Sequence, residues 1–252
     1  MTALTHLHRL DTPSGVLAAC CAAWGACYAT GPDLGVVVAV LANFTATLSG
    51  TLLDSSRTQP VAVREVGTGQ VRALVVAEMV VALALATAVS WRVAAGVALA
   101  LLLHLARTRL PRHGYAGPVA LATATVLLPA VTAYSAAGGQ ADPAVWLVFS
   151  GATALATGRA LRWPADDQPR DTTVRTRSAV GAALQLTAGG LLMTGAGLWF
   201  RFGWSWAVAG VVACSAFLLA ARDRPDHGES AAAASTVVLA VIPLLAKIPP
   251  SA

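Results

Sequence analysis

A succession of long apolar runs constrains the fold of this chain more than any other feature of its sequence. A helix that crosses a bilayer needs about 20 apolar residues. Lipid offers the backbone no hydrogen-bond partner, and the runs lack the alternation of a membrane barrel, so we expect each run to be helical. The sequence thus predicts an all-α integral membrane protein with a single domain over residues 1–252. Its nine expected spans are 14–29, 33–53, 70–89, 91–106, 115–136, 143–161, 178–200, 203–221 and 231–246.

The composition argues against a soluble protein. Hydrophobic residues make up 56% of the chain and charged residues only 12%, whereas roughly a quarter of the residues in a soluble domain are charged. The net charge is +5, but the arginines lie in short segments between apolar runs. Membrane topology explains such arginines better than a nucleic-acid partner does. The lipid bilayer is therefore the expected surrounding of the chain, and no nucleic-acid partner is expected.

The positions of the basic residues give an independent test of the number of spans. Loops on the cytoplasmic side of a membrane protein carry the excess of Lys and Arg. With nine spans, one side receives 14 of the 17 Lys and Arg residues, and the other receives Arg92, Arg201 and Lys247. Adding or removing a span in the middle would abolish this asymmetry. We expect a multi-pass protein of the cell membrane with a cytoplasmic N-terminus, an outside C-terminus and polar loops on the cytoplasmic side.

Acidic residues are mixed with arginines in two of these expected loops, residues 54–69 and 162–177. The positive-inside rule does not require carboxylates there. If a helix begins near Gln168, Asp167 and Asp171 lie one turn apart and face the same site. The charged residues of interest are Asp54, Arg57 and Arg64 in the first loop and Arg162, Asp167, Asp171 and Arg175 in the second.

Carboxylates beside arginines suit a diphosphate bound through magnesium. Mg²⁺ takes one or two carboxylates, keeps water ligands and completes its shell with phosphate oxygens, while arginine binds the remaining oxygens. The alternative is that Asp167 and Asp171 pair with neighbouring arginines in a solvated loop. The sequence alone leaves both interpretations open.

The layout of the chain and these motifs resemble the UbiA superfamily of intramembrane prenyltransferases. Its members carry an Asn-x-x-x-Asp-x-x-x-Asp motif, an Arg-Pro-hydrophobic-x-x-Gly stretch and a later Asp-x-x-x-Asp. Asp54 matches the last Asp of the first motif, residues 64–69 (Arg-Glu-Val-Gly-Thr-Gly) resemble the stretch after it, and Asp167 and Asp171 match the second motif. The resemblance implies an isoprenyl diphosphate substrate and Mg²⁺ bound by these three catalytic aspartates. It also implies substrate binding by Arg57, Arg64, Arg162 and Arg175.

Two positions depart from the pattern of that superfamily. Gly50 stands where the middle Asp is expected, and Ala46 stands where the Asn is expected. A small residue at position 50 resembles the UbiA-type terpene cyclases, which implies diphosphate loss followed by intramolecular cyclisation. The alternatives are a prenyltransferase that moves the isoprenyl group to an aromatic or lipid acceptor, and a non-catalytic membrane lipid-binding protein. Gly50 is accordingly expected beside the substrate.

Three further polar features lie within or beside the expected spans. Asn43 is about 16 Å deeper than Asp54 by helical rise, so it either lines the substrate cavity or forms a hydrogen bond between helices. Glu78 lies inside the third span, where an ionisable group usually faces a cavity or a partner. Were Glu78 a proton-coupled site, the chain would be a transporter. The basic segment 107–115 either caps the site or reflects topology alone.

Overall fold

The described part of the chain is helical. The computed structural model describes residues 14–29, 33–58, 60–110, 114–162 and 172–199, and no strand occurs among them. The chain divides into two compact units, the first ending at Gln140 and the second beginning at Ala141. The expected spans 203–221 and 231–246 lie outside the described residues. The prediction of an all-helical chain is confirmed for the part that is described.

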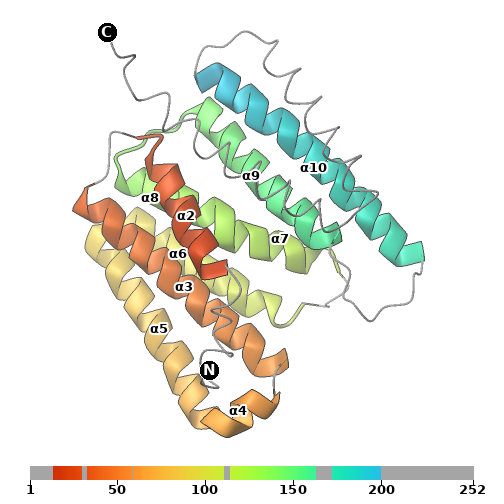
Figure 1. Ribbon diagram of the computed structural model, residues 1–252. Helices are drawn as coiled ribbons and strands as arrows, with labels where there is room; N and C mark the ends of the chain where they lie inside the picture. Colours follow the sequence, from red (N-terminus) through yellow and green to blue (C-terminus); the bar gives the residue numbers. More distant parts are fainter. Residues whose placement is uncertain (1–13, 30–32, 59, 111–113, 163–171, 200–252) are drawn as a thin grey trace. The chain divides into compact units, whose positions relative to one another are not determined.

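The first unit contains eight described helical segments and the second contains two. In the first unit these are α2 (Ser14–Ala26), α3 (Leu34–Thr58), α4 (Pro60–Val66), α5 (Thr68–Val89), α6 (Trp91–Arg107), α7 (Ala116–Ala122), the π-helix η1 (Thr123–Leu127) and α8 (Leu128–Ala136). In the second they are α9 (Pro143–Arg162) and α10 (Thr172–Trp199). Figure 1 shows α3 and α5 side by side, with the short helix α4 joining their ends.

Several helices are long and apolar enough to cross a membrane. Among the described residues there are four, at Leu34–Arg57, Thr68–Val89, Ala116–Ala136 and Pro143–Leu161. Three other expected spans coincide with helices α2, α6 and α10, which are shorter or less uniformly apolar. The described helices are thus those of a membrane protein.

Small residues form the interface among α3, α5 and α6. In a membrane, where lipid is as apolar as the side chains, small residues allow helices to approach closely and gain contact. The buried cluster consists of Ala39, Ala42, Ala46, Ala82, Ala86, Val93, Val97 and Leu101. The opposite face of α5 exposes Val76, Val80 and Val81, as expected for a surface in contact with lipid. Ala46 therefore packs in the core of the first unit.

One end of the first unit gathers its basic residues. Leu52 near the end of α3 packs against Val63 of α4 and Val71 at the start of α5, so α3 ends where α5 begins. Gly67 has a φ of 95°, a left-handed conformation that favours glycine, and it forms the turn between α4 and α5. The arginines at this end are Arg57, Arg64, Arg72, Arg107 and Arg109, whereas Arg92 begins α6 at the opposite end.

Side-chain caps help to define where two of these helices start. The Val36 amide donates to Asp33 Oδ1 at 2.8 Å before α3, and the Val93 amide donates to Ser90 Oγ at 3.3 Å before α6. Such caps satisfy amides that have no partner within the helix. Both lie at the end of the first unit opposite Asp54.

The described part of the second unit is a pair of closely packed helices. A Cβ at Gly151 of α9 would lie 2.8 Å from Leu192 Cγ, and one at Gly158 would lie 2.6 Å from the carbonyl oxygen of Gly181. The glycines therefore let α9 and α10 approach closely, as Figure 1 shows. Before α9, Asp142 Oδ1 accepts a hydrogen bond of 2.8 Å from the Ala144 amide.

Candidate functional site

A polar stripe runs along one face of α3. We use this name for Asn43, Thr47, Gly50, Asp54 and Arg57, whose spacings of four and three residues place them on one side of the helix. Asn43 and Thr47 are each 1% exposed, Asp54 is partly exposed and Arg57 is exposed. The polar stripe therefore leads from the exposed end of α3 into the interior of the first unit.

At the exposed end, a carboxylate of α3 pairs with an arginine of α6. Asp54 Oδ2 is 3.5 Å from Arg107 Nη2 at the end of α6, and the two side chains are 26% and 30% exposed. Arg57 Nη1 donates a hydrogen bond to the carbonyl of Thr108, the residue after α6. The ends of α3 and α6 are thus held together by charged groups that remain accessible from outside.

These residues occupy helices, whereas the sequence predicted a loop over residues 54–69. Asp54 and Arg57 lie in the last turns of α3, and Arg64 lies on α4. Hydropathy marks where the apolar run ends, but a helix can continue beyond that point if its residues still pack well. In this chain α3 continues because Leu52 packs against α4 and α5. The helix gives Asp54 and Arg57 fixed positions that a flexible loop would not give.

One turn deeper, the polar stripe meets a buried histidine. A Cβ at Gly50 would lie 2.4 Å from both Cγ and Nδ1 of His104 on α6. His104 is 4% exposed, and its Nε2 has no hydrogen-bond partner within the described structure. Glycine at position 50 therefore has a packing reason, since the imidazole ring occupies the space of a side chain there.

At the deep end of the polar stripe, an asparagine links two helices. Asn43 Nδ2 donates to Thr132 Oγ1 of α8 and to the Ala39 carbonyl, both at 2.8 Å. Its Oδ1 is buried and has no hydrogen-bond partner among the described residues. Asn43 thus forms the hydrogen bond between helices that was one of its two interpretations.

The Asn43–Thr132 hydrogen bond gives a prediction about stability. Asn43→Ala and Thr132→Val each remove one partner, and the double variant removes both. Since hydrogen bonds between membrane helices contribute about 0.6 kcal/mol on average and up to about 2, we expect a coupling energy in this range. Unfolding of the four proteins in detergent micelles measures it. A coupling energy of zero would contradict the hydrogen bond.

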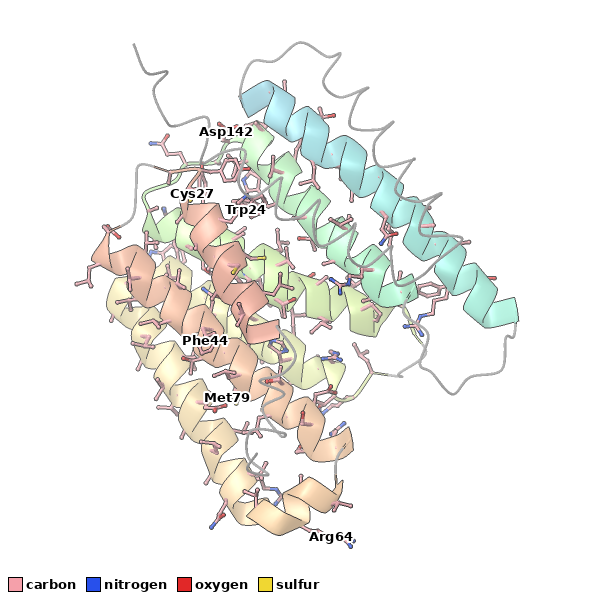
Figure 2. The ribbon with its side chains drawn as sticks, in the orientation of Figure 1. Trp24, Cys27, Phe44, Arg64, Met79 and Asp142 are labelled. Carbon is pink, nitrogen blue, oxygen red and sulfur yellow. The ribbon has the colours of Figure 1, made fainter. Side chains whose placement is uncertain are left out.

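The other predicted site residues lie on other helices or outside the described residues. Arg64 is exposed, and Figure 2 shows its side chain at the end of α4, pointing away from the helices. In the second unit, Arg162 ends α9 and Arg175 lies in the first turn of α10. Asp167 and Asp171 lie outside the described residues. Glu78 is partly buried in the middle of α5.

The described residues contain part of the chemistry that a magnesium diphosphate requires. Within them, no group of three or more His, Cys, Asp or Glu side chains is arranged to hold a metal ion. One carboxylate suffices for Mg²⁺ when water and phosphate oxygens complete the shell. Asp54 with Arg57 and Arg107 therefore fits magnesium diphosphate, with any further protein ligand coming from elsewhere in the chain.

Sequence reasoning identified Asp54 and Arg57 but overlooked His104. A single histidine in an apolar run forms no motif, and its contact with Gly50 joins residues from two helices. The available signal was an ionisable side chain inside an expected span. Comparison with known proteins adds no further residues, because no family model, no curated protein and no solved structure matches this chain.

Proposed function

We propose that this protein is an intramembrane, Mg²⁺-dependent enzyme that ionises an isoprenyl diphosphate, with cyclisation of the isoprenyl chain as the favoured outcome. The observation that carries the proposal is the pairing of Asp54 with Arg107 at the ends of apolar helices α3 and α6, where Arg57 donates to the Thr108 carbonyl. A substrate with an anionic head and a long apolar tail needs charged groups at such an end and apolar helices beyond it.

Each polar residue at this end has a role that follows from its chemistry. Mg²⁺ would neutralise the charge that develops on the diphosphate as it leaves. Asp54 would supply a carboxylate oxygen to that ion, the kind of ligand that magnesium prefers. Arg107 lies 3.5 Å from Asp54, so its guanidinium is close enough to bind phosphate oxygens held beside the same carboxylate. Arg57 orients the end of α6 through the Thr108 carbonyl.

Ionisation then breaks the allylic carbon–oxygen bond. Both electrons leave with the diphosphate, and the allylic carbon becomes a cation. A double bond of the same chain attacks this cation in a cyclase, whereas an acceptor attacks it in a prenyltransferase. Loss of a proton ends the cyclase reaction in a hydrocarbon, whereas addition of water followed by loss of a proton ends it in an alcohol. The apolar helices exclude bulk water, which would otherwise capture the cation at once.

The remainder of the proposal follows the resemblance to the UbiA superfamily. Asp167 and Asp171 complete the metal site, and Arg162 and Arg175 bind the diphosphate with Arg64. The bundle has nine spans, with its N-terminus and charged end on the cytoplasmic side. The gathering of arginines at one end of the first unit, with Arg92 at the other, supports this orientation.

The proposal predicts turnover of isoprenyl diphosphates without an added acceptor. Membranes containing the protein are incubated with geranyl, farnesyl or geranylgeranyl diphosphate and Mg²⁺, and organic extracts and released diphosphate are measured. We expect a terpene hydrocarbon or alcohol, and chelation of Mg²⁺ abolishes its formation. Membranes from cells without the protein are the control.

Other outcomes of this experiment distinguish the alternatives. Product that forms only after an aromatic or lipid acceptor is added identifies a prenyltransferase and rules out the cyclase. Release of no diphosphate from any substrate, with or without acceptors, rules out the enzyme and leaves the lipid-binding protein. The buried packing of His104 against Gly50 does not distinguish a cyclase from a transferase, because a glycine that makes room for the ring suits either enzyme.

A further inference from the structure

His104 is a buried ionisable group of the first unit that the proposed chemistry does not use. It lies on α6, three residues before Arg107, so both side chains project to the same side of the helix. Its ring lies against Gly50, which is one turn before Asp54 on α3. Two neighbouring helices therefore bring an imidazole to a level one turn deeper than the Asp54–Arg107 ion pair.

The combination of residues at this contact is unfavourable for packing alone. Glycine in the middle of a helix is a poor helix former, and a polar group buried without a hydrogen bond is disfavoured in a membrane interior. Leucine or alanine at these two positions would avoid both disadvantages. Nε2 of His104 nevertheless has no hydrogen-bond partner within the described structure, and the side chain is 4% exposed. A ligand that forms the missing hydrogen bond would explain why His104 is buried and why Gly50 leaves room for its ring.

We infer that His104 is a further substrate-binding residue, whose Nε2 forms a hydrogen bond with an oxygen of the diphosphate group bound at Asp54 and Arg107. A neutral imidazole with its proton on Nε2 is a donor at that atom, and diphosphate oxygens are strong acceptors. The ring takes the space that a side chain at position 50 would fill. This inference rests on the proposed function, and it adds a residue that the acidic motifs do not contain.

Binding of an unreactive substrate analogue to the purified full-length chain tests the inference. The probe is farnesyl thiodiphosphate with Mg²⁺. His104→Gln keeps a donor near the position of Nε2, whereas His104→Asn keeps one only near Nδ1. We expect His104→Asn to weaken binding about tenfold or more, as for the loss of one hydrogen bond to a charged group. We expect His104→Gln to remain within about threefold of the wild type, since it retains that bond.

The matched control removes a different buried polar group of the first unit. Thr125→Val deletes the hydrogen bond from Thr125 Oγ1 to the Leu121 carbonyl and should leave the affinity unchanged. Melting temperatures of all variants report on folding. If a His104 variant folds poorly, ¹⁵N-histidine NMR spectra of the wild type are used as the test. The His104 signal is expected to shift when inorganic diphosphate and Mg²⁺ are added.

The outcomes separate the two proposals. Equal affinities for the wild type, His104→Asn and His104→Gln overturn the role of His104 while the proposed function stands. A His104 signal that does not move with bound diphosphate has the same meaning. A wild type that binds no isoprenyl diphosphate overturns the proposed function and this inference together.

Discussion

Asp54→Asn is expected to lower the rate of diphosphate release by about 10²–10³-fold, as for the loss of one group that stabilises transition-state charge. Asparagine keeps the volume of the side chain but loses the negative charge that binds Mg²⁺. The protein should stay folded, because the ion pair with Arg107 is partly exposed and such pairs contribute at most about 1 kcal/mol. The rate is measured on purified protein with farnesyl diphosphate and Mg²⁺, together with the melting temperature.

The same helix offers a matched control. Asp33→Asn makes the identical change just before the start of α3, where Asp33 accepts a hydrogen bond from the Val36 amide. Asparagine is as good a cap as aspartate, so this variant should keep the wild-type rate. If Asp33→Asn and Asp54→Asn lose activity equally, the loss at Asp54 is a general effect on α3 and not an effect on a metal ligand.

An exchange of charges separates a metal ligand from a structural ion pair. The double variant Asp54→Arg with Arg107→Asp retains opposite charges at the ends of α3 and α6 but moves the carboxylate to the other helix. We expect this variant to fold and to be inactive. Wild-type activity in the exchanged protein would mean that Asp54 serves only to hold Arg107.

Asp167→Asn combined with Asp171→Asn should also abolish diphosphate release, because these carboxylates are the proposed second half of the site.

The helical character of the chain could be read from its apolar runs, but the ends and irregularities of the helices could not. The run expected over 143–161 forms α9 from Pro143 to Arg162, whereas α3 continues to Thr58, beyond the expected end at residue 53. Polar residues at the end of a span lower hydropathy without breaking the helix. The π-helix η1 lies within the run expected over 115–136. Pro129 is its signal in retrospect, because proline lacks an N–H and its ring crowds the carbonyl of Thr125.

The candidate site was predictable only where its residues lie close together in the sequence. Asp54 and Arg57 belong to one motif and lie on one face of α3. Arg107 belongs to the basic segment 107–115, which was interpreted either as a cap over the site or as a sign of topology alone. Its ion pair with Asp54 could not be predicted, because the pair depends on how α3 and α6 pack. His104 required the three-dimensional contact, since nothing in a single sequence relates position 104 to position 50. Contacts between helices are set by packing, and hydropathy does not encode them.

The contact between Gly50 and His104 makes the effect of Gly50→Ala depend on the residue at position 104. In the wild type, the added Cβ would lie 2.4 Å from Cγ of His104. Rotation of the ring about the Cβ–Cγ bond leaves Cγ in place, so the overlap is relieved only by another χ1 rotamer of His104 or by a shift of the helices. Overpacking of this kind costs about 1–3 kcal/mol. Alanine is a better helix former by about 1 kcal/mol, so we expect a net loss of stability.

In a protein that already carries His104→Ala, Gly50→Ala should increase the stability instead of lowering it. Removal of the ring leaves space beside Gly50, so Gly50→Ala fills part of a cavity and gains its helix propensity, up to about 1 kcal/mol. Unfolding of the wild type, both single variants and the double variant in detergent, followed by helical circular dichroism, measures this change. Gly190→Ala on α10, where a Cβ would meet no atom of the described residues within 4 Å, is the control for propensity. A gain of stability from Gly50→Ala as large as that from Gly190→Ala would contradict the contact, because the contact adds an overpacking cost at position 50 only.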